Sequence, residues 1–221
     1  MILKISEYQN FLFDCDGVIL DSNFIKTKSF EEVLENEKSN HRDQFIEYHL
    51  SNTGVSRYDK FDFYLKNIRT SDNYQKEMKD MLLKFSKTIK KNLISCNLTS
   101  NVEFILKKLN RLNKYLFIIS ASDEEELIEI CNYRKLNIYF KAILGSPLNK
   151  IDNINKLNLS VKDYKKTIFF GDSLSDYKAA SHFNFDFVYI KKYSLWQVPE
   201  KIKKNPKFQE IEDFSFLEIV P

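Results

Sequence analysis

Two aspartates separated by one residue, Asp14 and Asp16, follow the apolar run Asn10–Phe13 and precede Gly17. Side chains alternate along a strand, so both carboxylates could project from the same lip where the run ends. Carboxylates this close repel each other unless a cation lies between them. Oxygen ligands favour Mg²⁺, so the pair indicates a magnesium site. Taken alone, the same residues could simply form a tight turn.

A second apolar run, Thr167–Phe170, is also followed by carboxylates, Asp172 and then Asp176 four residues later. Asp176 would lie about one helical turn into the next helix and face back toward the site. In open α/β sheets, ligands bind at this carboxyl edge of the strands. The alternative is that Asp172 or Ser173 caps a helix and Asp176 interacts with its dipole. For this segment alone, capping is the favoured interpretation.

The elements that would position these residues are short apolar runs separated by amphipathic stretches. The runs lack polar alternation, which is typical of strands covered by helices on both faces. The predicted strands are Asn10–Phe13, Tyr115–Ser120, Ile138–Leu144, Thr167–Phe170 and Phe185–Ile190. Alternating strands and helices predict an α/β fold with a doubly wound parallel sheet. The segment after Trp196 is expected to add a helix and a final edge strand near Phe214–Ile219.

The stretch Ser22–Asn92 breaks this alternation and contains no convincing strand. Its patterns predict four helices, Asn23–Glu37, His41–Leu50, Arg57–Ile68 and Asp72–Lys90. We therefore expect an inserted helical domain over residues 22–92. The catalytic core would consist of residues 1–21 and 93–221.

Composition excludes several classes of protein. With 221 residues, 43% hydrophobic and 29% charged, the chain is typical of a soluble globular protein. The net charge is +3 and the basic residues are scattered, which argues against nucleic-acid binding. Three separated cysteines without a CxxC pair predict neither disulfides nor a zinc site. Without a signal peptide or membrane helix, we expect a cytoplasmic protein with no membrane partner, either a monomer or a small homo-oligomer.

Taken together, four segments resemble the four motifs of the haloacid dehalogenase superfamily. The segments are, in order, FLFDCDGVILDS, FIISAS, LGSPLNK and FFGDSLSD. Their order and spacing agree across about residues 11–190, which is most of the chain. The resemblance implies a Rossmann-like core and a helical cap of the superfamily's first class. Within it, the chain resembles the β-phosphoglucomutase-like and phosphoglycolate phosphatase-like proteins.

The resemblance implies catalytic roles for Asp14, Asp16, Ser120 and Lys150. Asp14 would attack phosphorus and form an aspartyl-phosphate. Asp16 would protonate the leaving oxygen and then deprotonate the hydrolytic water. The Ser120 hydroxyl and the Lys150 ammonium would contact the phosphoryl oxygens as these gain charge. Outside this pattern, Ser120 would be interpreted as a helix cap and Lys150 as a surface lysine.

The resemblance also implies a set of metal ligands. Mg²⁺ would be held by Asp14, Asp172 and the backbone carbonyl of Asp16, with Asp176 supporting the site from outside the ligand shell. The metal would neutralise charge on the transferring group. Dehalogenases generally lack the second aspartate, so Asp16 favours phosphoryl transfer. A phosphonate-cleaving member would need a cap lysine that forms a Schiff base, and no motif identifies one.

In the insertion, Gly54 lies in a short loop and Arg57 begins the next predicted helix. The chain has only four glycines, which marks this loop as constrained. The loop resembles that of β-phosphoglucomutase-like proteins, where the arginine contacts the substrate's non-transferring phosphate. Those mutases carry a lysine where this chain has Thr53 and a histidine where it has Lys26. That histidine delays attack by water on the intermediate, so its absence favours hydrolysis.

The predicted activity is therefore a phosphoric monoester hydrolase acting on a small phosphorylated metabolite. The segments DSNFIKTKSF…YH…NTGVSRYDKF resemble those of phosphatases found beside surface-sugar biosynthesis genes. This resemblance favours a sugar or sugar-acid phosphate as the substrate. The predicted substrate-binding residues are Arg57, Gly54, Ala121, His49 and Lys26, with Lys60 as a further candidate. A lone helical histidine such as His49 is often structural. The alternatives are a phosphomutase, or a binding protein on the same scaffold with weak or no turnover.

Overall fold

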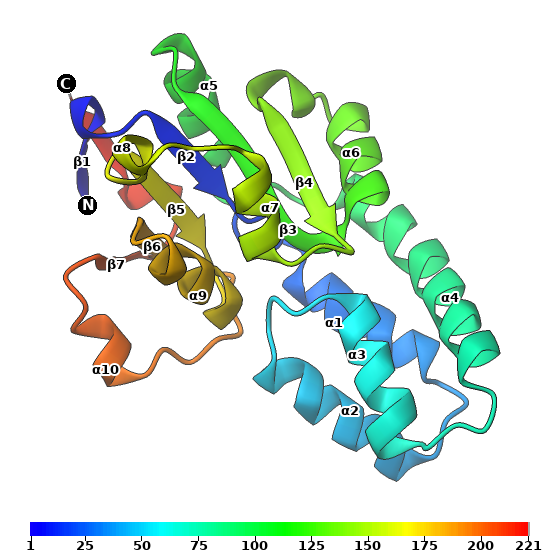
Figure 1. Cartoon of the computed structure of the whole chain (residues 1–221). Coiled ribbons are helices and arrows are strands. Elements are labelled where there is room, and N and C mark those ends of the chain that lie inside the picture. The colour runs from blue at the N-terminus through cyan, green and yellow to red at the C-terminus, as the bar shows by residue number, and fades with distance from the viewer. Residues whose placement is uncertain (221) are drawn as a thin grey trace.

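Six parallel strands form the main sheet in the computed structural model, which describes residues 1–220 (Figure 1). Their order is β4-β3-β2-β5-β6-β7. The strands are β2 (Asn10–Phe13), β3 (Tyr115–Asp123), β4 (Ala142–Ser146), β5 (Thr167–Gly171), β6 (Asp186–Ile190) and β7 (Phe208–Ile211). Chain order reverses beside β2, which pairs with β3 on one side and β5 on the other. Ligands bind at such switch points, beyond the carboxyl ends of the strands.

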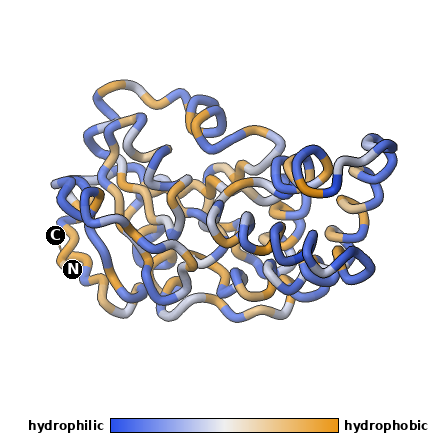
Figure 2. Tube along the Cα trace, turned by 90° about the horizontal axis from the view of Figure 1, so that it is seen from below, coloured by the Kyte–Doolittle hydropathy of each residue, from blue (hydrophilic) through white to orange (hydrophobic). Residues whose placement is uncertain are grey.

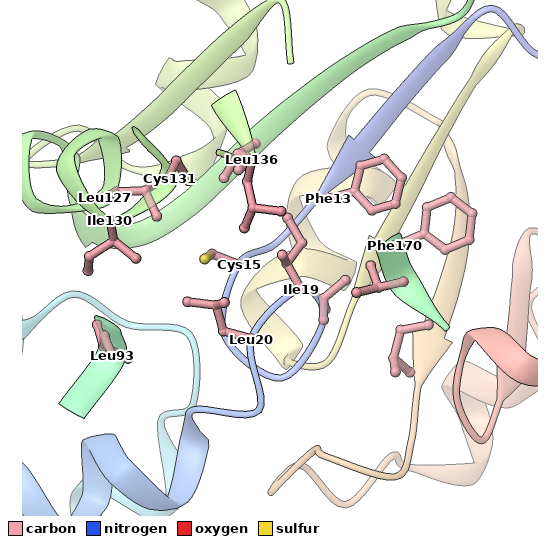
Figure 3. Packing of buried hydrophobic residues seen from close by; sticks show 14 of the residues in the cluster. Phe13, Cys15, Ile19, Leu20, Leu93, Leu127, Ile130, Cys131, Leu136 and Phe170 are labelled. Atoms are coloured by element: carbon pink, nitrogen blue, oxygen red, sulfur yellow. The ribbon is translucent and has the colours of Figure 1, made fainter. Parts of the chain in front are cut away.

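Helices cover both faces of this sheet, as the runs without polar alternation predict. Along β2, Phe11 and Phe13 pack into one hydrophobic cluster, and Leu12 packs into the other. The Phe13 ring stacks on Phe170 of β5 with centroids 5.0 Å apart (Figure 3). The helices of the core are α5 (Val102–Arg111), α6 (Glu124–Tyr133), α7 (Lys150–Lys156), α8 (Val161–Tyr164), α9 (Leu174–His182) and α10 (Glu200–Lys203).

The insertion between β2 and β3 is helical, which confirms a cap on an α/β core. It contains α1 (Asn23–Val33), α2 (Ser39–Ser51), α3 (Arg57–Phe63), a π-helical turn η2 (Tyr64–Ile68) and α4 (Tyr74–Ser95). In Figure 1, α1, α2 and α3 form a separate layer beside the sheet, and α4 leads back toward α6. Because α4 continues to Ser95, the division at residue 92 falls within its last turns, and the domain boundaries stay a prediction.

The cap has an aromatic core of its own. The Phe30 ring lies 4.4 Å from the Phe85 ring and 5.4 Å from the rings of both Phe45 and Phe61, measured between centroids. All four side chains are buried. Figure 2 shows hydrophobic and hydrophilic residues interspersed along the whole chain trace. Among residues 1–220, no helix has the length and hydrophobicity needed to cross a membrane.

Predicted and observed strands differ most clearly at two places, and β3 continues three residues beyond the predicted Ser120. Ile138–Leu144 begins with a 3-10 turn, η3 (Asn137–Tyr139), and the strand β4 starts at Ala142. The expected edge strand near Phe214–Ile219 is wrong, because β7 forms that edge of the main sheet. The end of the chain instead forms a 3-10 turn, η4 (Phe214–Phe216), and β8 (Glu218–Val220), which pairs with β1 (Ile2–Lys4).

The reason for the second error lies in side-chain burial. Phe214 is fully buried and its ring lies 5.5 Å from that of Phe170, so its hydrophobicity reflects packing against the sheet. In β7, the side chains of Phe208 and Ile211 are buried and the two between them are exposed. That short, half-polar run gives a weak strand signal.

Candidate active site

Three buried carboxylates converge at the carboxyl edge of the sheet. Phe13 of β2 pairs with Phe170 of β5, which brings Asp14 next to the turn that carries Asp172. One oxygen each from Asp14, Asp172 and Asp176 lies within 4.8 Å of the others. Such a hard-oxygen donor set fits a divalent cation of the Mg²⁺ type. These residues could hold a metal. The cluster joins Asp14 to both carboxylates that follow the second apolar run, whereas the Asp16 carboxylate, which the sequence pairs with Asp14, is not among the three.

Asp176 has most of its hydrogen-bonding capacity occupied by protein groups. Its Oδ2 accepts hydrogen bonds from the backbone N–H groups of Asp172 at 3.2 Å and Ser173 at 3.0 Å, and from Ser173 Oγ at 2.6 Å. Its Oδ1 contacts the Lys150 ammonium. The Ser173–Asp176 pair is also the capping box of α9. The Asp176 side chain therefore both caps α9 and contacts the Lys150 ammonium, and its place outside the ligand shell stays a prediction.

Lys150 begins α7 and places its ammonium between two of these carboxylates. Its Nζ lies 3.0 Å from Asp14 Oδ2 and also contacts Asp176 Oδ1. Burial alone would lower the pKa of Lys150, but the charges of Asp14 and Asp176 raise it above its ordinary value. Lys150 therefore keeps a fixed positive charge next to the predicted nucleophile, where a transferring phosphoryl group would gain negative charge.

Asp16 projects into a different set of partners. Its carboxylate accepts hydrogen bonds from Ser22 Oγ at 2.6 Å and Ser122 Oγ at 2.7 Å, and it contacts the Lys26 ammonium of α1. Burial would raise the pKa of Asp16, but the Lys26 charge and these hydrogen bonds lower it. The Asp16 side chain is thus occupied by these three donors, and a metal contact through its backbone carbonyl stays a prediction.

The carboxylate cluster favours a cation. Burial, together with the nearby charges of Asp176 and Asp16, raises the pKa of Asp14 to about 7, although Lys150 opposes the shift. Burial and the charge of Asp14 likewise raise the pKa of Asp172 well above its ordinary value. Without a cation, the cluster therefore holds protons that an exposed aspartate would have lost.

These shifts predict a pH-dependent effect of Mg²⁺ on stability. Between about pH 4 and pH 7, folded Asp14 holds a proton that the unfolded chain has released, so the metal-free protein loses stability as the pH rises. Mg²⁺ must displace that proton, so its stabilisation is expected to be larger at pH 8 than at pH 5. Melting temperatures with Mg²⁺ or EDTA at both pH values measure this, and an equal Mg²⁺ effect would contradict it.

Two residues of this site were missed in the sequence. Asn23, the first residue of α1, donates from Nδ2 to Asp172 Oδ2 at 2.6 Å and to the Tyr193 carbonyl at 2.8 Å. Ser122 lies between Lys26 and Asp16 and hydrogen-bonds to both, at 2.7 Å each. Their positions in the sequence could have indicated them, since Asn23 follows the first motif directly and Ser122 lies two residues after Ser120.

Gly17 explains why Asn23 can reach Asp172 of the carboxylate cluster. Its φ of +74° is in the left-handed region, and a Cβ there would lie 2.4 Å from both Asn23 Nδ2 and Asp172 Oδ2. A side chain at Gly17 would therefore displace the hydrogen bond that joins the cap to Asp172.

All five predicted substrate-binding residues line the cavity that also contains Asp14, Asp16 and Asp172. The five are Arg57, Gly54, Ala121, His49 and Lys26. The volume of the cavity is about 50 Å³. That is room for a few water molecules, so a sugar phosphate could enter only if the cap moved away. Whether these residues contact substrate stays a prediction.

Ser120 lies within β3, three residues before its end, and does not line this cavity. It is fully buried, and its Oγ accepts a hydrogen bond from the Ser122 backbone N–H at 3.2 Å. The contact predicted between Ser120 and a phosphoryl oxygen also stays a prediction.

The cap is fastened to the core by polar contacts around the cavity. Arg57 of α3 forms a bidentate pair with Glu126 of α6, at 2.8 and 2.7 Å, and also donates to Ser86 Oγ at 3.1 Å. The Gly54 carbonyl accepts from Ser175 Oγ at 2.9 Å. A Cβ at Gly54, whose φ is +75°, would lie 2.2 Å from that hydroxyl. The scarce glycine thus permits the cap loop to touch the core.

Sequence comparison matches residues 11–190 to the family described as haloacid dehalogenase-like hydrolase. No curated protein sequence is significantly similar to the chain. A predicted phosphoglycolate phosphatase from Haemophilus somnus has a similar structure, with a TM-score of 0.71, 19% identity, and coverage of 95% of this chain and 96% of that one. A predicted phosphatase from Clostridium acetobutylicum has a TM-score of 0.69 and 21% identity, and the match covers 92% of this chain and 93% of that one. CbbY from Rhodobacter sphaeroides, in complex with xylulose-1,5-bisphosphate, has a TM-score of 0.71 and 11% identity, and the match covers 96% of this chain and 97% of that one.

Proposed function

The chain belongs to the haloacid dehalogenase-like hydrolase family, and within it we propose a magnesium-dependent phosphatase that acts on a small phosphorylated metabolite. One observation carries the proposal. Asp14, Asp172 and Asp176 form a buried cluster of carboxylates at the carboxyl edge of the sheet, with the Lys150 ammonium beside the first of them. This combination suits a dianionic phosphoryl group, whose charge the cation and Lys150 would share.

In the proposed reaction, Asp14 attacks phosphorus and displaces the leaving oxygen, which forms an aspartyl-phosphate on Asp14. Asp16 donates its proton to the leaving oxygen and later accepts a proton from water as the intermediate is hydrolysed. Lys150 holds the Asp14 carboxylate in position and contacts the phosphoryl oxygens. When bound, Mg²⁺ supplies charge neutralisation, and Asp14, Asp172 and the Asp16 carbonyl would hold it.

Asp16 must be protonated before it can act as the acid, and Lys26 opposes this. The ammonium keeps Asp16 ionised while the cap is closed without substrate. We infer that substrate binding displaces Lys26 from Asp16, so that the acid becomes available only when a leaving group is present. Water is excluded from the closed cavity during the first step.

We propose a sugar or sugar-acid phosphate as the substrate. A helical cap over the site suits small soluble substrates, because its side chains form much of the binding cavity. Two similar structures are named for small phosphorylated metabolites, one as a predicted phosphoglycolate phosphatase and one as a complex with the sugar bisphosphate xylulose-1,5-bisphosphate. Hydrolysis is proposed in preference to mutase chemistry because Lys26 occupies the position where the mutases carry a histidine.

The test is release of inorganic phosphate from a panel of sugar phosphates, sugar-acid phosphates and p-nitrophenyl phosphate, with Mg²⁺ or with EDTA. We expect release with Mg²⁺ and a loss of at least about 100-fold on metal removal, since the cation offsets much of the charge at phosphorus. Isomerisation of a sugar phosphate without phosphate release would identify a mutase. Metal-independent release at the same rate would contradict the proposal.

A further inference from the structure

Lys60 of α3 is a buried lysine that the reaction above does not use. Its exposed fraction is 3%, and it lines the same cavity as Asp14 and Asp16. Its Nζ lies 2.8 Å from Nδ1 of His49. Within residues 1–220, no carboxylate oxygen lies within ion-pair distance of it, so its ammonium has no counter-ion there.

The hydrogen bonds around His49 orient this lysine. Thr27 Oγ1 donates to the Asn23 carbonyl at 3.0 Å, so it can only accept from Nε2 of His49, also at 3.0 Å. The imidazole proton is therefore on Nε2, and Nδ1 accepts from Lys60. Burial, with the charges of Lys60 and Lys26, lowers the pKa of His49 to about 3, so the ring is neutral. His49 thus fixes one N–H of Lys60 and leaves two free.

The other two cationic side chains that line the cavity from the cap are already neutralised. Arg57 forms its bidentate pair with Glu126, and Lys26 pairs with Asp16. Lys60 instead packs with its Nζ 5.5 Å from the centroid of the Phe30 ring. Burial and the charge of Lys26 lower its pKa to about 7, although the charge of Asp16 opposes the shift. A buried charge of this kind is destabilising unless a partner supplies the opposite charge.

We propose that Lys60 determines substrate specificity by binding a second anionic group, a carboxylate or a second phosphate, on the leaving-group side of the substrate. This inference rests on the proposed function, because it assumes that Asp14 attacks the first phosphoryl group. His49 is the positioning residue that aims Lys60, and Thr27 fixes the tautomer of His49. The missing counter-ion of Lys60 would then arrive with the substrate.

The test compares substrates that share a carbon skeleton and differ in this second charge. Glycerate 3-phosphate and glycerol 3-phosphate form a carboxylate pair, and fructose 1,6-bisphosphate and fructose 6-phosphate form a phosphate pair. The pair with the larger wild-type preference for the more anionic member identifies the group. Lys60→Met is expected to reduce that preference, as a ratio of kcat/KM values, by on the order of 10- to 100-fold. If Lys60→Met lowered kcat/KM by the same factor for both substrates of that pair, the proposal would be overturned.

Lys66→Met is the matched control, because Lys66 belongs to the adjoining turn η2 and its side chain is 60% exposed. It should leave the ratio unchanged. His49→Leu is expected to reduce the ratio as Lys60→Met does, whereas His49→Gln, whose amide oxygen can accept from Lys60, should retain most of it. An unchanged ratio in His49→Leu would remove the positioning role.

Thermal melting of the ligand-free protein separates this inference from the phosphatase activity. Lys60→Met removes an unpaired buried charge, so we expect its melting temperature to rise by about 2–4 °C, while Lys66→Met does not change it. If no compound is hydrolysed, the phosphatase proposal fails, and stabilisation by glycerate 3-phosphate still tests Lys60. Stabilisation that disappears in Lys60→Met supports the anion site, and stabilisation that persists overturns it.

Discussion

Asp14→Asn is expected to lower kcat by about 10⁴-fold or more, because an amide oxygen is a poor nucleophile and the acyl-phosphate cannot form. The same change is expected to maintain or raise stability in EDTA. Asp14 is one of three buried carboxylates within 4.8 Å, and burial and its neighbours raise its pKa to about 7. Removing this charge relieves repulsion, so the loss of activity would not reflect unfolding. Phosphate release and thermal melting measure the two effects.

Asp21→Asn is the matched control for this variant. Asp21 belongs to the same segment after β2, but its side chain is exposed and makes no contact with the cluster. We expect it to retain the activity and stability of the wild type. Phosphate release that persisted in Asp14→Asn at the wild-type rate would remove Asp14 from the reaction.

Lys150→Met is expected to lower the free energy of unfolding by on the order of 3 kcal/mol, because it leaves buried carboxylates without their counter-charge. The Lys150 side chain is 5% exposed, and its ammonium contacts both Asp14 and Asp176. Denaturant unfolding in EDTA measures the loss. Mg²⁺ should restore part of it, since the cation can replace some of the missing positive charge. Turnover should fall as well, because no ammonium then contacts the phosphoryl oxygens.

Lys156→Met provides the comparison, because Lys156 lies in the last turn of the same helix and is exposed. Its removal should change the free energy of unfolding by less than about 0.5 kcal/mol. If both substitutions changed the free energy of unfolding equally, Lys150 would not be the residue that neutralises the buried carboxylates.

The convergence of the carboxylate cluster could be predicted from sequence because parallel strands share one carboxyl edge. Asp14 and Asp172 each follow a buried run, and adjacency of β2 and β5 is enough to bring them together. The helical character of the insertion could also be predicted, because the sequence of Ser22–Asn92 lacks any strand pattern. Both predictions depend on local patterns and on a topology that few alternatives satisfy.

The contacts across the cavity could not be predicted in this way. Arg57 and Glu126 are 69 residues apart, and their pairing depends on where the cap rests on α6. The scarcity of glycine marked the loop at Gly54 as constrained, but the reason, contact with Ser175, comes from the core. Likewise, neither His49 nor Lys60 reveals its partner through spacing, because they belong to different helices.

The central claim is a covalent phosphoryl group on Asp14, and acid quenching followed by mass spectrometry tests it directly. p-Nitrophenyl phosphate is the substrate of choice, since its leaving group needs no proton from Asp16. In Asp16→Asn, formation of the intermediate should then continue while its hydrolysis slows. We predict a phosphoryl adduct on the peptide that contains Asp14, accumulating in Asp16→Asn and absent from Asp14→Asn. Turnover without any such adduct in Asp16→Asn, or an adduct on another residue, would contradict the account.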